Sequence, residues 1–84
     1  MIQPTSLEAY QVLEPELGNL QRTVYQVLVF NPGMSNHDIA RTLHWEINRV
    51  TPRVKELRDK GLVIQNGSKI DRLTNKRVMC WKVV

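Results

Sequence analysis

Two arginines and an asparagine lie close together in the middle of the chain, and their side chains can read nucleic-acid bases. They are Asn48, Arg49 and Arg53. A guanidinium can donate two hydrogen bonds to the edge of guanine, and a carboxamide can pair in a similar way with adenine. Thr51 and Lys55, which lie among them, suit phosphate oxygens or a thymine methyl group. This set predicts a surface that binds double-stranded DNA.

A second group of basic residues lies nearer the C-terminal end of the sequence, around a polar stretch that we expect to be a loop. Its members are Lys69, Arg72, Lys76 and Arg77. Cations on such a loop can lie along phosphates or enter the minor groove. Residues 43–84 carry ten Lys or Arg against four Asp or Glu, whereas residues 1–42 carry two against four. This asymmetry favours a polyanionic partner, and the alternative is a solvated basic face that keeps a small domain soluble.

The remaining side chains offer little to an enzyme or a metal site. His37 and His44 are seven residues apart and Cys80 is the single cysteine, so a zinc site would lack ligands at the usual spacing. We find no Gly-rich phosphate loop and no nucleophile motif. We therefore expect no catalytic residues, metal, cofactor or small-molecule ligand. The chain has no apolar run of about 18 residues and no secretory start, so we expect a cytoplasmic protein that avoids membranes.

Hydrophobic spacing predicts the elements that position the basic residues. Residues 20–28 carry apolar side chains at helical intervals, and the run Asn31-Pro32-Gly33 ends that helix. Ser35 and Asp38 have the spacing of a capping pair, so a second helix begins there. A third helix ends at Gly61, and its buried stripe is Ile47, Val50, Val54 and Leu57. The DNA-reading residues would occupy the opposite face of this third helix.

Pro52 interrupts the third helix in the sequence. Its ring removes one backbone hydrogen bond, clashes with the carbonyl of residue 48 and biases Thr51 away from helical geometry. Either the helix begins near Glu46 and bends at Pro52, or its regular part begins at Thr51. We favour the bent helix because the apolar stripe continues through the proline.

The pattern changes from helix to strand after Gly61. The run Leu62-Val63-Ile64 is apolar, and Asn66-Gly67 suits a tight turn or a bulge. Residues 78–83 alternate in the manner of a half-buried strand, which places Trp81 in the core. Residues 72–77 would form the loop between the strands, with its tip at residues 73–77. The predicted order is three helices followed by a two-stranded hairpin.

The first residues predict one further element. Ser6 can cap a short extra N-terminal helix over residues 6–13, and Pro15 ends it. The length of the chain suits a single domain. We therefore divide it into an N-terminal segment, residues 1–18, and one folded domain, residues 19–84.

Two runs of sequence carry a resemblance to a known family. The run SNHDIARTL, residues 35–43, resembles the first helix of a winged helix-turn-helix unit, and VTPRVKELRDKGLV, residues 50–63, resembles the recognition helix leading into the wing. The Gly-Leu-Val ending is similar to that of MarR-type regulators, and the size resembles winged-helix proteins of phages and prophages. The resemblance covers roughly residues 19–84. It implies an α+β fold, a three-helix winged helix-turn-helix with a C-terminal β-hairpin wing and the third helix in the major groove.

Two departures from MarR-type proteins bear on this expectation. Pro52 stands where those proteins often have a polar DNA contact. The chain also lacks the additional long helices with which such regulators dimerise. It would therefore be either a monomer or a homodimer formed through residues 6–13.

Three functions remain open from the sequence. We favour a sequence-specific transcriptional regulator of a phage or mobile element that binds double-stranded DNA. The alternatives are a protein-interaction winged helix, such as a replication or packaging accessory whose basic wing meets an acidic partner, and an architectural DNA binder. Because the set contains Asn48, Arg49 and Arg53 and not lysine alone, it favours the sequence-specific regulator over the architectural DNA binder.

Overall fold

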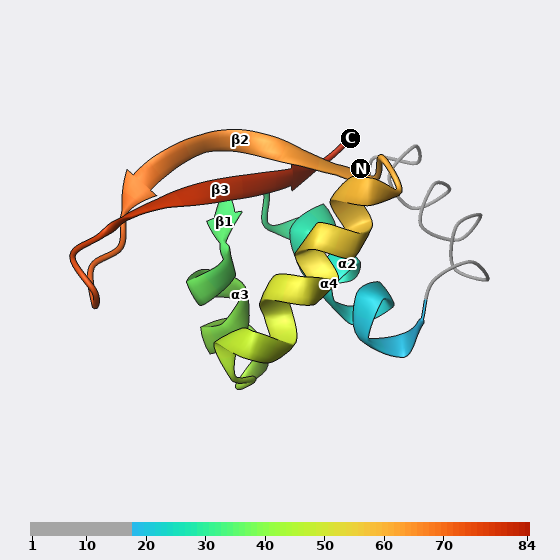
Figure 1. Ribbon diagram of the computed structural model, residues 1–84, viewed down its shortest axis with the longest axis horizontal. Coiled ribbons are helices and arrows are strands. Elements are labelled where there is room, and N and C mark those ends of the chain that lie inside the picture. Colours follow the sequence, from blue (N-terminus) through green and yellow to red (C-terminus); the bar gives the residue numbers. More distant parts are fainter. Residues whose placement is uncertain (1–17) are drawn as a thin grey trace.

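Three helices and a three-stranded antiparallel sheet make up the described part of the protein, residues 18–84 of a computed structural model. The helices are α2 (Asn19–Phe30), α3 (Asn36–Leu43) and α4 (Ile47–Asp59). The strands are β1 (Met34–Ser35), β2 (Val63–Ile70) and β3 (Arg77–Val83). Figure 1 shows the β2–β3 hairpin running across one side of the three helices. The predicted α+β winged helix is confirmed, whereas the predicted helix over residues 6–13 lies outside the described residues.

The sheet contains a third strand that the hydrophobic pattern did not predict. The two residues of β1 pair with β3, Met34 with Trp81 and Ser35 with Cys80, so the strand order is β1-β3-β2. Ser35 is also the N-cap of α3. Its hydroxyl accepts from the backbone N–H of Asp38 at 3.1 Å, and the Asp38 carboxylate accepts from the N–H of Ser35 at 3.1 Å. The predicted capping pair is therefore present, and it joins α3 directly to the sheet.

The core lies between the helices and one face of the sheet. It includes the predicted Trp81, which is 3% exposed, and three members of the predicted stripe of α4, namely Val50, Val54 and Leu57. Ile47, the fourth member, is 37% exposed, so the prediction that it is buried was wrong. It lies in the first turn of α4, where it lines a hollow together with Asn36 and Met79.

The third helix of the sequence analysis, α4, runs through its proline. Pro52 is the sixth of its thirteen residues, and the helix begins at Ile47 with Glu46 as the N-cap. The alternative in which the regular helix begins at Thr51 was therefore wrong. Pro52 has no N–H to donate to the carbonyl of Asn48. The Thr51 hydroxyl donates to the Ile47 carbonyl at 3.2 Å, one turn back.

The wing is a hairpin with a bulge in its first strand. The pairing register of β2 and β3 shifts between Gln65 and Ser68, and Gly67 there has φ of 75°. Of the two predicted alternatives at Asn66-Gly67, a tight turn or a bulge, the structure has the bulge, where a left-handed residue is well suited. The reversal itself lies at residues 71–76, where the Asn75 N–H donates to the Asp71 carbonyl at 2.7 Å. Arg77, predicted to be a loop residue, opens β3 instead.

Candidate nucleic-acid interface

The first two turns of α4 present polar side chains to solvent. Asn48 and Arg49 are exposed, and with Trp45 they line a hollow of about 430 Å³ at the turn between α3 and α4. The Arg49 guanidinium lies over the Trp45 ring, 5.3 Å from its centroid. Trp45 is half-buried against the core, so the arginine rests on a fixed surface. Among residues 18–84, Arg49 has no acidic partner, so its charge is available to a ligand.

Thr51 is exposed one turn further along α4, on the side that faces the start of α3. Its hydroxyl accepts a long hydrogen bond, 3.5 Å, from the Asn36 carboxamide. The same carboxamide accepts from the Trp81 indole N–H at 2.8 Å. Thr51 is therefore connected through Asn36 to the central strand of the sheet.

Arg53 does not share the exposed face of α4 with Asn48. Its guanidinium donates twice to the Glu56 carboxylate, at 2.7 and 3.0 Å, and the side chain is 23% exposed. Glu56 also accepts from Gln21 of α2 at 2.9 Å. These hydrogen bonds raise the pKa of Arg53 and, with Arg53 as the main cause, lower the pKa of Glu56. Arg53 thus lies on the flank of α4 that meets α2, where an intramolecular partner occupies it.

Lys55 lies on the exposed side of α4. Its ammonium meets the Asp59 carboxylate at 3.1 Å, and both side chains are well exposed. A surface pair of this kind contributes little because water screens it. Lys55 can therefore exchange its partner for a phosphate at small cost.

The four predicted wing residues divide into two groups. Lys69 forms an ion pair with Asp38 of α3. Arg77 donates to the Ser68 hydroxyl at 3.1 Å across the hairpin and is exposed. Arg72 and Lys76 are exposed in the turn and form no ion pair within the described part of the chain. The end of the wing is therefore a cluster of available cations.

A network of charges that sequence reasoning missed holds the base of the wing against α3. Arg41 donates to Asp71 at 2.7 Å and to Asp38 at 2.9 Å. Asp71 is 1% exposed, and its second oxygen accepts from the Thr74 N–H and hydroxyl at 3.0 and 3.1 Å. The Arg41 guanidinium, followed by the Thr74 N–H, holds the pKa of Asp71 well below its usual range. The spacing Asp71–Thr74 is a local turn signal, but Arg41 has no comparable signal in the sequence.

Asp38 takes part in the same network. Burial opposes its ionisation, but Lys69, the Ser35 N–H and Arg41 outweigh that effect and lower the pKa of Asp38. The carboxylate thus caps α3 and binds two cations, one from α3 and one from the wing.

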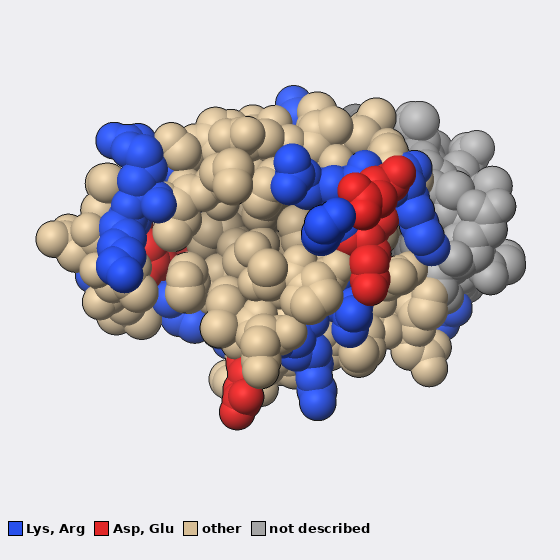
Figure 2. Space-filling model, in the orientation of Figure 1, with Lys and Arg blue, Asp and Glu red and all other residues tan. Residues whose placement is uncertain are grey.

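The charges gather at separate places on the face that carries the wing and α4. Figure 2 shows Lys and Arg over the wing on the left and, mixed with Asp and Glu, over α4 on the right. Most of the surface between them is uncharged. In the described residues no group of three or more His, Cys, Asp and Glu side chains is placed to hold a metal ion. No helix within residues 18–84 has the length and apolar character needed to cross a membrane.

Comparisons with known proteins agree with this architecture. Residues 19–64 match the family described as winged helix-turn-helix DNA-binding. Two solved structures share the fold at low sequence identity. One is titled a possible transcriptional regulator from Methanosarcina mazei Go1, with a TM-score of 0.67 and 15% identity over 93% of this chain. The other is the PcaV transcriptional regulator from Streptomyces coelicolor in complex with its natural ligand, with a TM-score of 0.64 and 16% identity over 98% of this chain.

Both of these proteins are longer than this chain, which spans 65% and 58% of their lengths. A search of curated protein sequences finds no match. The match over residues 19–64 covers more than half of the sequence and includes all of α2, α3 and α4. The chain therefore belongs to the winged helix-turn-helix DNA-binding family.

Proposed function

We propose that the protein is a transcriptional regulator that recognises a specific sequence in double-stranded DNA. One observation carries this proposal. Asn48 and Arg49 are neighbours at the exposed start of α4, and Arg49 has no acidic partner among residues 18–84. Helix-turn-helix proteins place their base contacts near the N-terminus of the recognition helix. The family supports the same role, as does the description of the two solved structures as a possible transcriptional regulator and a transcriptional regulator.

The contacts divide into base reading and phosphate binding. Asn48 and Arg49 read base edges in the major groove, where their hydrogen-bond geometry matches adenine and guanine. The other contacts go to phosphates or the minor groove, and they come from Thr51, Lys55, Arg72, Lys76 and Arg77. Arg53 and Lys69 are left out of this set because Glu56 and Asp38 occupy them. Their role is to hold α4 and the wing in place.

Two more proposals follow, the first from the resemblance to small phage and prophage proteins and the second from the departure from MarR-type proteins. The regulated genes belong to a phage or mobile element, and the protein acts either as a monomer or as a homodimer. A homodimer would bind two half-sites about 34–36 Å apart, one turn of DNA, or at a multiple of that distance. The sequence selected from a random duplex library therefore shows how many protein molecules bind one duplex. A repeated half-site indicates a homodimer, and its absence indicates a monomer.

The proposed division of contacts is tested by comparing two variants on two duplexes. Arg49→Ala should cost roughly 1–3 kcal/mol of binding free energy on a duplex selected from a random library and much less on a scrambled one. The double variant Lys76→Ala/Arg77→Ala should weaken both duplexes by similar factors, because phosphate contacts carry no base information. The measurement is a competition titration of each variant against both duplexes.

The outcomes separate the candidate functions. Equal losses on both duplexes for both variants would replace the regulator with an architectural DNA binder. Absence of duplex binding by the unaltered protein would favour the protein-interaction module, whose wing would meet an acidic partner.

A further inference from the structure

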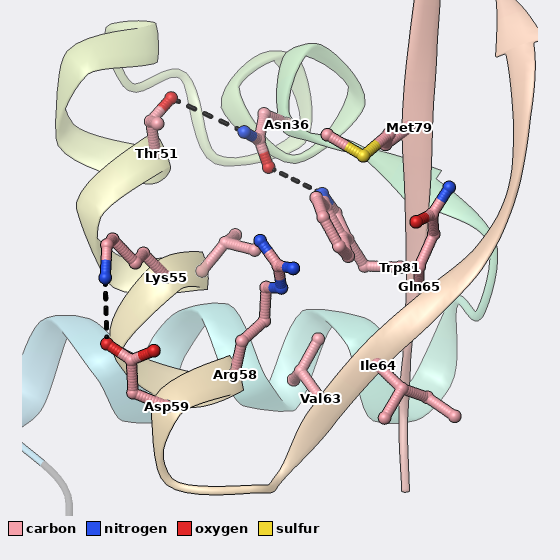
Figure 3. Close-up of a pocket in the computed structure, with 11 residues that line it drawn as sticks. Asn36, Thr51, Lys55, Arg58, Asp59, Val63, Ile64, Gln65, Met79 and Trp81 are labelled. Carbon is pink, nitrogen blue, oxygen red and sulfur yellow. Dashed lines mark hydrogen bonds and ion pairs between the residues drawn. The ribbon is translucent and has the colours of Figure 1, made fainter.

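Arg58 is a basic residue of α4 that the sequence analysis did not single out. Its guanidinium lies over the indole of Trp81, 4.6 Å from the ring centroid (Figure 3). The residue is exposed and, within residues 18–84, has no acidic partner. Arg53 and Lys55 of the same helix are paired with Glu56 and Asp59. Arg58 thus has an orienting contact and an uncompensated charge.

This arginine borders a groove of about 640 Å³ between α4 and the β2–β3 hairpin. Lys55, Arg58 and Gln65 supply hydrogen-bond donors to the groove, and the half-exposed Ile64 and Met79 supply apolar surface. Its one acidic lining residue, Asp59, is held by Lys55. The groove is therefore suited to an anion that also carries an apolar body.

The sugar–phosphate backbone of DNA has this chemistry, since each charged phosphate is joined to a largely apolar deoxyribose. A guanidinium that rests on an aromatic ring keeps its N–H groups free at the edge, where they can bind two phosphate oxygens at once. The stacking also restricts the long side chain before the ligand arrives. Trp81 itself is held by its hydrogen bond to Asn36, so the platform is rigid.

Arg58 does not share the side of α4 that carries Arg49. The two residues are nine positions apart, which corresponds to about 13.5 Å along the helix axis and a rotation of about 180° around it. A contact from Arg58 would therefore go to the DNA backbone and not to the base edges that Arg49 reads.

We propose that the groove between α4 and the β2–β3 hairpin receives the sugar–phosphate backbone of one DNA strand. Arg58 is the phosphate contact and Trp81 is the positioning residue that orients it. This inference rests on the proposed DNA binding and adds to it a contact surface and two residues.

Substitution of Arg58 tests the phosphate contact. Arg58→Ala should weaken binding by about tenfold on both selected and scrambled duplexes. It should also reduce the slope of log affinity against log salt by about one unit. Arg58→Lys should keep the slope, because the charge remains, and lose part of the affinity, because the planar stack is gone. Arg53→Ala is the matched control on the same helix and should retain the slope of the unaltered protein.

A chemically altered duplex locates the contact. Neutral methylphosphonate linkages are placed one at a time along the selected duplex. The unaltered protein should lose affinity at the phosphate that Arg58 contacts, whereas Arg58→Ala should bind the neutral and charged forms of that position equally well. Inorganic phosphate should not compete at matched ionic strength, and competition would indicate a site for a free anion instead.

The positioning role of Trp81 is tested by asking whether substitutions of Trp81 and Arg58 have independent effects on DNA binding. Trp81→Phe should preserve the affinity, because an aromatic face remains. Trp81→Leu should lower the affinity about as much as Arg58→Lys does and keep the salt slope, because the Arg58 charge remains. It should cause no further loss of affinity in an Arg58→Ala background. If Trp81→Leu does not fold, the Arg58→Lys and Arg58→Ala comparison still tests the site.

The proposal is overturned if Arg58→Ala keeps the salt slope of the unaltered protein or remains sensitive to every neutral linkage. That result differs from failure of the proposed function, in which the unaltered protein would show no salt-dependent duplex binding.

Discussion

At the scale of single residues, the available charge of a cation depends on its neighbours in space. Residue type alone predicted that Arg53 and Lys69 contact DNA just as Arg49 and Lys76 do. In the structure, however, Arg53 and Lys69 each have a carboxylate partner. The partner of Arg53 lies three residues away in the sequence and could have been anticipated. The pairing of Lys69 with Asp38 spans 31 residues and follows only from the fold.

Asp71 provides a residue-scale prediction about pH. Its pKa is lowered in the folded protein, so its contribution to stability is present above the unfolded value, about 3.9, and is lost as the pH falls below it. We expect the free energy of unfolding to decline on acidification from about pH 5 towards pH 2. Asp71→Asn should be less stable at neutral pH and decline less steeply. Urea unfolding across this pH range measures both quantities.

Asp38 and Glu56, whose pKa values are also lowered, should leave the variant some acid sensitivity. An acid decline in Asp71→Asn as steep as that of the unaltered protein would show that the Arg41–Asp71 contact does not stabilise the fold.

At the scale of elements, predictions succeeded where the local signal was strong. The capping pair at Ser35 and Asp38 and the stripe of α4 each follow from a local physical rule. The capping pair is present in the structure, and three of the four residues of the stripe are buried there, Ile47 being the exception. The strand β1 could not be found in this way, because two residues are too few to show alternation. The turn of the wing was misplaced by one residue at its C-terminal end, since Arg77 can pair with Ile70 across the hairpin.

Pro52 supports an element-scale prediction. The residue is exposed inside α4, so its ring removes a helical hydrogen bond without filling the core. Pro52→Ala should stabilise the protein by about 1–3 kcal/mol, measured by thermal or urea unfolding. Pro32→Ala, in the loop after α2, is the control and should give no such gain. A Pro52→Ala protein no more stable than the unaltered one would mean that the local backbone has already compensated for the proline.

At the scale of the whole molecule, the order of three helices followed by a hairpin was predictable because the helices carried their own hydrophobic period, whereas β1, between α2 and α3, carried none. The candidate site was only partly predictable. Residue types marked Asn48, Arg49 and the wing cations, but the groove at Arg58 and Trp81 joins α4 to β3 and exists only after folding. The excess of basic residues in the second half of the chain corresponds in the structure to cations on α4 and the wing (Figure 2).

Salt-dependent binding to a duplex tests the central claim most directly. The proposed phosphate contacts are Lys55, Arg58, Arg72, Lys76 and Arg77, and each should contribute about −0.9 to the slope of log affinity against log salt concentration. The titration of the unaltered protein with a selected duplex should therefore give a slope of roughly −4 to −5. A flat dependence on salt, or no binding to duplex DNA at low salt, would contradict the account.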